Sequence, residues 1–296
     1  MRLAVLGATG FIGSALVPAL AQRGEVVAIS RRGSVGEQPG ARALAADVTD
    51  AASIRRALEG IDVAYYLVHS LGSPDYAAVD RVAATTVARE AERAGVQQIV
   101  YLGGLGDDRP DLSSHLRSRI ETAFALASGN VPVTTVRAAV VVGRGSAGFE
   151  TIVALVDRLP AMVAPRWIST PTQPIALGDV VRYLVGVAGN DAAIGESFDA
   201  GGPEILTYRQ MIERVARLRR RSPRIVEVPV LSPRLSSYWL HLVTPVRAGV
   251  ARPLVEGMRN ATVARDNRIQ RLLPGPLTSF DDAAREALAF ESDTRA

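Results

Sequence analysis

Short apolar runs alternate with helical patterns up to residue 145. The apolar runs lie at 3–6, 25–30, 43–46, 62–68, 98–102 and 131–142. Apolar positions recur at helical spacing after residue 13, between 50 and 60, and over 75–94 and 113–127. This alternation predicts βαβ units and a parallel sheet covered on both faces. Right-handed crossovers then give a doubly wound α/β sheet of the Rossmann type, with ligands beyond the carboxyl ends of its strands.

The pattern loosens after residue 145. We expect helices over 149–158, 179–187, 208–218 and 281–288, one short strand at 197–200, and interruptions by many prolines. The chain therefore divides into a Rossmann domain over 1–200 and a smaller, mostly helical lobe over 201–296. Tyr208, Trp239 and Leu240 give this lobe an aromatic and apolar surface, so we expect it to roof a substrate pocket.

A glycine-rich turn joins the first strand to the first helix. Gly7, Gly10 and Gly13 are spaced three residues apart. The first glycine permits a sharp turn, the second a close approach to a pyrophosphate, and the third close packing of helix on strand. The helix N-terminus also favours a bound phosphate. We expect this turn to bind a dinucleotide through Gly7, Thr9, Gly10, Phe11, Ile12 and Gly13.

The second strand ends in Ser30, Arg31 and Arg32, with no acid before Glu37. Proteins of this fold that bind NAD place an acid there to accept hydrogen bonds from the ribose hydroxyls. Serine and arginine instead suit a 2′-phosphate. We therefore expect NADP as the cofactor, with NAD as the alternative. The ends of the third and fourth strands add Asp47, Val48, Leu67, Val68 and His69 to the expected cofactor contacts.

Composition excludes several kinds of chemistry. The chain has no cysteine, so disulfides, thiol nucleophiles and zinc–thiolate sites are excluded. It also has no lysine, which excludes Schiff bases. All 34 basic residues are arginines, and the net charge is +4. Arginines over 214–224 are not interleaved with aromatic residues, so a solvated helix face is expected rather than nucleic-acid binding.

The three histidines are His69, His115 and His241, too scattered in sequence to suggest a metal site. A structural hydrogen bond is the simpler expectation for His69, and a place in the core or a pocket wall for His241. We expect no signal peptide and no membrane span, and a cytoplasmic protein. Contact of the C-terminal lobe with a membrane surface is the alternative to its role as a pocket roof.

Several motifs together resemble the atypical and extended short-chain dehydrogenase/reductase proteins and the related NmrA-like group. They are the glycine turn, 47–50 (DVTD), 66–70 (YLVHS) and 140–145 (VVVGRG). Segments 165–167 (PRW), 173–176 (QPIA) and 201–203 (GGP) are similar to a bacterial branch of NAD(P)-binding proteins. The resemblance covers nearly the whole chain and implies a Rossmann fold and an NAD(P) cofactor.

The family's catalytic serine, tyrosine and lysine are all replaced in this sequence. The serine position falls at Gly103 or Gly104, and the Tyr-x-x-x-Lys positions fall at His115 and Arg119. These two share a helix face. Histidine can replace tyrosine as the general acid, and arginine can hold a ribose or phosphate oxygen without shuttling protons. The alternative is that His115 only packs near the cofactor.

Two functions follow from the resemblance. The first is an NADP-dependent oxidoreductase that acts on a carbonyl, enone or quinone-like small molecule, with His115 and Arg119 at the nicotinamide. The second is a non-catalytic NAD(P)-binding sensor or assembly protein that reports redox state to a protein partner. The missing catalytic set favours the sensor, and the intact cofactor turn with an apolar pocket favours the enzyme.

Overall fold

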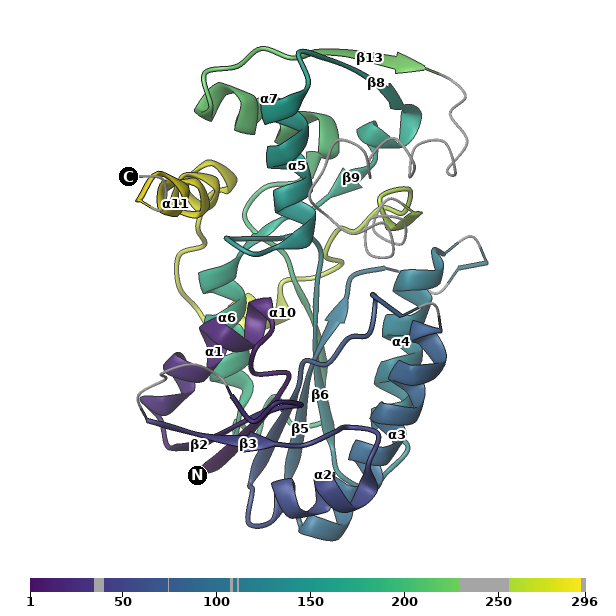
Figure 1. The fold of residues 1–296 in the computed structure, drawn as a ribbon, viewed down its shortest axis with the longest axis vertical. Coiled ribbons are helices and arrows are strands. Elements are labelled where there is room, and N and C mark those ends of the chain that lie inside the picture. The colour runs from purple at the N-terminus through teal and green to yellow at the C-terminus, as the bar shows by residue number, and fades with distance from the viewer. Residues whose placement is uncertain (35–39, 74, 107–108, 111, 229–255, 294–296) are drawn as a thin grey trace.

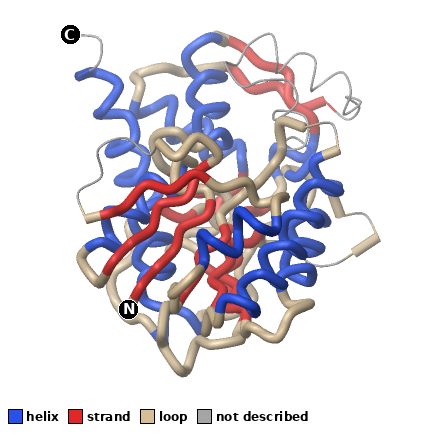
Figure 2. Tube along the Cα trace, turned by 60° about the horizontal axis from the view of Figure 1, so that its bottom comes forward, coloured by secondary structure: helices blue, strands red, loops and turns tan. Residues whose placement is uncertain are grey.

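A seven-stranded parallel sheet organises the structure (Figures 1 and 2). The computed structural model describes residues 1–34, 40–73, 75–106, 109–110, 112–228 and 256–293. The strand order is β11-β6-β5-β4-β1-β2-β3, so the order reverses beside β1, where a doubly wound sheet binds its ligand. The strands are β1 (Arg2–Leu6), β2 (Glu25–Ser30), β3 (Ala41–Ala45), β4 (Val63–Tyr66), β5 (Gln98–Gly104), β6 (Val133–Ala138) and β11 (Ser197–Ala200). The predicted fold class is confirmed.

Helices cover both faces of the sheet (Figure 1). On one face, α1 (Phe11–Ala21) and α6 (Leu177–Val187) pack on Leu3, Val5 and their neighbours. On the other face, α2 (Ala51–Leu58), α3 (Tyr76–Ala94) and α4 (Ser114–Leu126) pack on Ala4, Leu6 and theirs. Successive residues of β1 thus point into opposite cores, as strand geometry requires. The central strands β1, β2 and β4 are therefore buried along most of their length.

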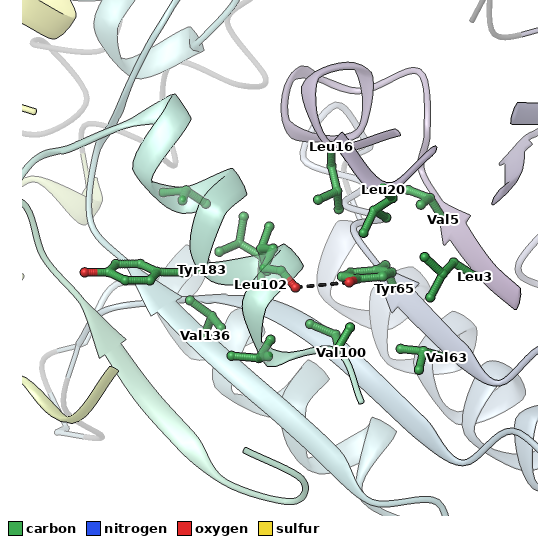
Figure 3. Close-up of a cluster of buried hydrophobic side chains, with 14 of the residues drawn as sticks. Leu3, Val5, Leu16, Leu20, Val63, Tyr65, Val100, Leu102, Val136 and Tyr183 are labelled. Carbon is green, nitrogen blue, oxygen red and sulfur yellow. Dashed lines mark hydrogen bonds between the residues drawn. The ribbon is translucent and has the colours of Figure 1, made fainter. Parts of the chain in front are cut away.

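The buried Tyr65 of β4 ties the sheet to α6 (Figure 3). Its ring lies among Leu3, Leu20 and Val63 in the cluster that Figure 3 draws. Its hydroxyl donates a hydrogen bond to the Leu184 carbonyl at 3.0 Å. A buried phenol needs such a partner because water does not reach it.

The apolar run at 131–142 is not one strand. It divides into β6 and β7 (Val141–Val142), and β7 leaves the main sheet to pair with β10 (Ile175–Ala176). The sequence pattern does not reveal this division because apolar residues continue from the end of β6 into β7. The run at 98–102, in contrast, extends as β5 through Gly103 and Gly104.

A second core lies beyond the carboxyl ends of the strands. It joins α5 (Ala147–Arg158), α7 (Tyr208–Leu218) and α11 (Phe280–Asp293), with β8 (Ala161–Pro165) paired to β13 (Arg224–Val228) (Figure 1). The short helix α10 (Arg268–Leu272) packs on the sheet instead. The division of the chain at residue 200 stays a prediction. Trp239, Leu240 and His241 lie outside the described residues.

Candidate functional site

The glycine turn between β1 and α1 is closed by backbone contacts. Gly7 has a φ of +91°, and the N–H groups of Gly7 and Ala8 both donate to the Ile29 carbonyl, at 3.1 and 3.2 Å. A Cβ on Gly7 would lie 3.1 Å from the Leu67 carbonyl carbon and oxygen. A Cβ on Gly13 would lie 2.3 Å from the Gly7 oxygen. Gly7 and Gly13 are therefore required by the fold itself.

Gly10 differs because little lies beside it. It is exposed, and a Cβ there would meet only the Gly7 oxygen within 4 Å, at 3.2 Å. Gly10 is the N-cap residue of α1 and has an extended backbone. Because glycine has no side chain, it offers no side-chain acceptor to the first N–H groups of α1. This open cradle at a helix N-terminus fits a pyrophosphate. Thr9 is exposed beside it, and Phe11 and Ile12 are half-buried.

The end of β2 presents two exposed arginines, Arg31 and Arg32. Ser30 is buried, and its hydroxyl donates to the Ser34 carbonyl at 3.2 Å. The expected Ser30 contact with a phosphate would compete with this loop bond, so the arginines are the better candidates. An exposed arginine pair and no acid at this position fit a 2′-phosphate.

Asp47 and Val48 follow β3 at the same edge of the sheet. One Asp47 carboxylate oxygen accepts from the Thr49 N–H at 2.9 Å and from its hydroxyl at 2.7 Å. These hydrogen bonds, and the charge of Arg31 to a smaller extent, lower the pKa of Asp47. The carboxylate therefore stabilises its own turn, which brings Val48 to the start of α2.

The segment after β4 passes directly beside the glycine turn. The Leu67 N–H donates to the Leu6 carbonyl at 3.0 Å, and the Leu67 backbone is the group that a Cβ on Gly7 would meet. Val68 packs on the opposite core. This path delivers His69 to the carboxyl end of the sheet, close to α3 and α4.

His69 stands between Asp80 of α3 and His115 of α4. Its Nδ1 lies 2.7 Å from one Asp80 oxygen, and its Nε2 lies 3.3 Å from Nδ1 of His115. The other Asp80 oxygen accepts from the Ser70 N–H at 2.9 Å. The edge of Tyr76 closes on the His69 ring, at a centroid distance of 6.4 Å. One carboxylate and two imidazoles are thus joined in a single chain.

Burial decides the ionisation of this chain. It lowers the pKa of His115 to about 3, and the nearby positive charges of His69 and Arg119 act in the same direction. Burial and Arg119 also lower the pKa of His69, which the hydrogen bond and charge of Asp80 only partly offset. Burial disfavours the Asp80 carboxylate, but the bonds from His69 and Ser70 outweigh it and lower its pKa. At neutral pH, Asp80 is therefore ionised and both histidines are neutral.

Arg119 and the two glycines of β5 lie next to His115. The Arg119 guanidinium donates to the Leu102 carbonyl and lies over the Tyr101 ring, 5.0 Å from its centroid. A Cβ on Gly104 would lie 3.1 Å from Leu116 and 3.7 Å from Arg119. No side chain stands at the position of the family's serine, and the tightly packed α4 occupies the adjoining space.

A cavity of about 300 Å³ connects these parts. Phe11 and Ile12 of the glycine turn line it together with His69, His115 and Arg119. Its remaining wall is largely apolar and comes from β5, from 138–141 and from the second core through Tyr208 and 146–148. The structure thus brings the predicted pyrophosphate turn and the predicted acid into one apolar cavity. The roles of these residues stay predictions.

Sequence reasoning missed Asp80. Its signal lay in the helix pattern: Asp80 shares one face of α3 with Ala83, Ala84, Val87 and Ala91, all buried. A carboxylate on an apolar face needs a partner, but the sequence could not name His69 as that partner.

No group of three or more histidine, aspartate or glutamate side chains among the described residues is arranged to hold a metal ion. Within the same residues, no helix combines the length and apolar character needed to span a bilayer.

Comparison with known proteins supports the cofactor assignment. Residues 7–130 match the family model for NAD(P)H-binding proteins. The (4-alkanoyl-5-oxo-2,5-dihydrofuran-3-yl)methyl phosphate reductase of Streptomyces griseus is 26% identical over 293 residues, covering 97% of this chain and 98% of that protein.

Solved structures share the fold across nearly the whole chain. A nucleoside-diphosphate-sugar epimerase of Staphylococcus aureus superposes with a TM-score of 0.77 at 14% identity, covering 97% of this chain and 100% of its own. The NADPH-dependent quinone oxidoreductase of Escherichia coli, in complex with NADPH, also gives 0.77, at 20% identity, covering 97% and 99%. The predicted NAD(P) cofactor is confirmed, and the preference for NADP stays a prediction.

Proposed function

We propose that this chain, in which residues 7–130 are an NAD(P)H-binding domain with the fold of NAD(P)-binding epimerases and reductases, is an NADPH-dependent oxidoreductase. Its substrate would be a small carbonyl, enone or quinone-like molecule. The observation that carries this proposal is the apolar cavity shared by Phe11 and Ile12 with His115. Hydride transfer needs such a site, because it must hold the nicotinamide and the acceptor together away from water.

The proposal gives each part of the cavity a role. The glycine turn holds the pyrophosphate, Arg31 and Arg32 hold the 2′-phosphate, and the apolar wall orients the substrate. Bound NADPH supplies the hydride. His115 is the proton donor to the substrate oxygen, since its Nε2 has no hydrogen-bond partner among the described residues. Arg119 donates a hydrogen bond to the Leu102 carbonyl of β5, and this contact positions α4, the helix that carries His115.

The similar proteins include both reductases and sugar epimerases, and the curated relative supports the choice of reduction. The relative from Streptomyces griseus is a reductase, and one structural neighbour is an NADPH-dependent quinone oxidoreductase. An epimerase of this fold relies on the Tyr/Lys pair that the resemblance places at His115 and Arg119. The proposal locates the protein in the cytoplasm, and a chain without cysteine is compatible with that location without requiring it.

A turnover assay tests the proposal. Purified protein is incubated with NADPH and a panel of aldehydes, ketones, enones and quinones, and nicotinamide absorbance is followed. We expect oxidation of NADPH that His115→Phe abolishes while NADPH affinity stays within about threefold. Gly10→Val should lose both. Equal activity in wild type and His115→Phe would refute the role of His115, and no turnover on any substrate would favour the alternative below.

The alternative is a non-catalytic NAD(P)H sensor that signals to a protein partner. One observation favours it: the Arg119 guanidinium, in the position of the family's lysine, is bonded to the Leu102 carbonyl and stacked on Tyr101. In that case NADPH would bind without being consumed and would change the affinity for the partner. Pull-down from cell extract with and without NADPH, using Gly10→Val as the control that cannot bind it, tests this version.

A further inference from the structure

We propose that Asp80, His69 and His115 form a proton relay in which His69 stores a proton and His115 passes it outward as a neutral imidazole. The proposal gives a function to Asp80, which the sequence did not single out, and proton storage to His69, for which the sequence predicts a cofactor contact or a structural hydrogen bond. Its use in substrate reduction rests on the proposed function, but the relay itself is a property of the protein without substrate.

Asp80 fixes the first step of the relay. Both of its oxygens are occupied as acceptors, one by Nδ1 of His69 at 2.7 Å and the other by the Ser70 N–H at 2.9 Å. An ionised carboxylate has no proton to give, so His69 must carry its hydrogen on Nδ1. The only nitrogen of His69 that gains or loses a proton is then Nε2, which faces His115.

The 3.3 Å contact between the two rings therefore has two forms. When His69 is neutral, its Nε2 accepts from His115 Nδ1–H, and the outer nitrogen of His115 has a lone pair. When His69 is protonated, its Nε2–H donates to Nδ1 of His115, and the outer nitrogen must carry the hydrogen. One proton added to His69 thus appears as a hydrogen on Nε2 of His115, and His115 stays neutral in both forms.

This coupling resolves a conflict in the site. A histidine whose pKa is lowered to about 3 is a poor store for a proton at neutral pH. His69 is the better store of the two, because Asp80 faces it from α3 and favours its cationic form, whereas Arg119 of α4 opposes protonation of both rings. Burial still lowers the pKa of His69, so its protonated form is the minor one at neutral pH. The Tyr76 ring also contacts the His69 ring, in an edge-to-face arrangement. The positive charge of protonated His69 would stay beside Asp80, away from the position of the substrate.

Reduction starts from the form in which His69 is protonated and His115 carries its hydrogen on Nε2. The substrate carbon gains a hydride from NADPH, which becomes NADP⁺, and the C=O π bond breaks. The substrate oxygen gains the hydrogen of His115 Nε2, while His115 Nδ1 takes the hydrogen of His69 Nε2. His69 ends neutral, and a proton from solvent returns to it by the reverse path: it adds to Nε2 of His115, and the hydrogen on His115 Nδ1 moves to Nε2 of His69. Asp80 remains ionised throughout.

Nitrogen NMR of histidine tests the relay without turnover. The chain has only three histidines, and variants His69→Gln and His241→Gln assign their signals in ¹⁵N-histidine-labelled protein. We expect His69 to become imidazolium as pH falls, and His115 to change from the Nδ1–H to the Nε2–H tautomer with the same midpoint. An unchanged His115 tautomer across the His69 titration, or His115 becoming imidazolium first, would overturn the relay.

Two variants with a matched control sharpen this test. Asp80→Asn removes the carboxylate that favours protonated His69, so the shared midpoint should fall by about one to three pH units. Asp75→Asn removes an exposed carboxylate just before the same helix and should leave the midpoint unchanged. In His69→Gln, the tautomer switch of His115 should be absent. A switch that persists in His69→Gln, or an equal shift in both aspartate variants, would refute the assignment.

Turnover provides the second readout. His69→Gln, which keeps a polar group but cannot store a proton, should slow single-turnover reduction of a carbonyl substrate by about a hundredfold or more when NADPH is saturating. Coupled titration without any reductase activity would leave the relay standing and count against the proposed function. Reductase activity that is unaffected in His69→Gln would count against the relay alone.

Discussion

Replacing Gly10 or Gly13 with alanine adds one methyl group at two different places in the glycine turn. We expect the first replacement to affect cofactor binding and the second to affect stability. A Cβ at position 13 would lie 2.3 Å from the Gly7 oxygen and 2.8 Å from the Ala8 Cα, so backbone has to move. Overpacking of this kind costs about 1–3 kcal/mol, and the rigid neighbours place Gly13→Ala at the upper end. A loss of this size lowers the melting temperature by about 2–10 °C in a chain of this size class.

The methyl group of Gly10→Ala faces open space instead. Its backbone is extended, with φ −76° and ψ 171°, which alanine adopts freely, and the nearest atom is the Gly7 oxygen at 3.2 Å. The free energy of unfolding should therefore change by less than about 1 kcal/mol. The methyl would stand where the pyrophosphate approaches the helix N-terminus, so NADPH affinity should fall at least about tenfold, or 1.4 kcal/mol.

Thermal unfolding followed by circular dichroism, and calorimetric titration with NADPH, measure both quantities on the same preparations. The expected outcome is a crossed pattern: Gly13→Ala loses stability, and Gly10→Ala loses binding at wild-type stability. Normal NADPH affinity in Gly10→Ala would show that the phosphates lie elsewhere. Wild-type stability in Gly13→Ala would contradict the close approach of α1 to β1.

Three further predictions concern selectivity, stability and pH. Arg31→Ala or Arg32→Ala should reduce the NADP-over-NAD affinity ratio by about ten- to a hundredfold, measured by titration with each nucleotide, and an unchanged ratio in both variants would exclude the arginines as its cause. Tyr65→Phe should cost about 1–3 kcal/mol of unfolding free energy in urea, because it leaves the buried Leu184 carbonyl without its 3.0 Å partner; a neutral effect would place water there. Because the pKa of His115 is lowered on folding, its neutral form favours the folded state, and stability falls as pH drops below the unfolded value near 6.5. His115→Phe should reduce that slope by up to about 1.4 kcal/mol per pH unit between pH 6 and 4, and an unchanged slope would contradict the lowered pKa.

The sequence predicted the sheet well because its strands are apolar on both faces and are separated by clear helix stops. Gly95, for example, ends α3 in the left-handed conformation with φ +76°, as a C-terminal glycine should. The division after Ala138 escaped prediction because it depends on the pairing of β7 with β10, which is a contact between distant segments. Local pattern carries no information about such a partner.

The candidate site shows the same division. The glycine turn could be predicted because its three glycines lie within seven residues, in a spacing that is itself the signal. The contact of His69 with His115 could not be predicted, since 46 positions separate them and the packing of α4 beside α3 and β5 brings them together. The importance of Asp80 follows from that contact and was therefore equally hidden.

The chain crosses several times between the two cores, which constrains how the cavity between them can open. Among the described residues, the chain passes from one core to the other after Ala138, Ile168, Ala200, Met258 and Ile269. A rigid-body movement of the second core away from the sheet would open the cavity only if all of these connections bent at once. Admission by local displacement of side chains and loop backbone is the easier route. The same multiple threading makes the two cores mutually dependent, so heating should melt them in one calorimetric transition, and proteolysis should not release either as a folded fragment.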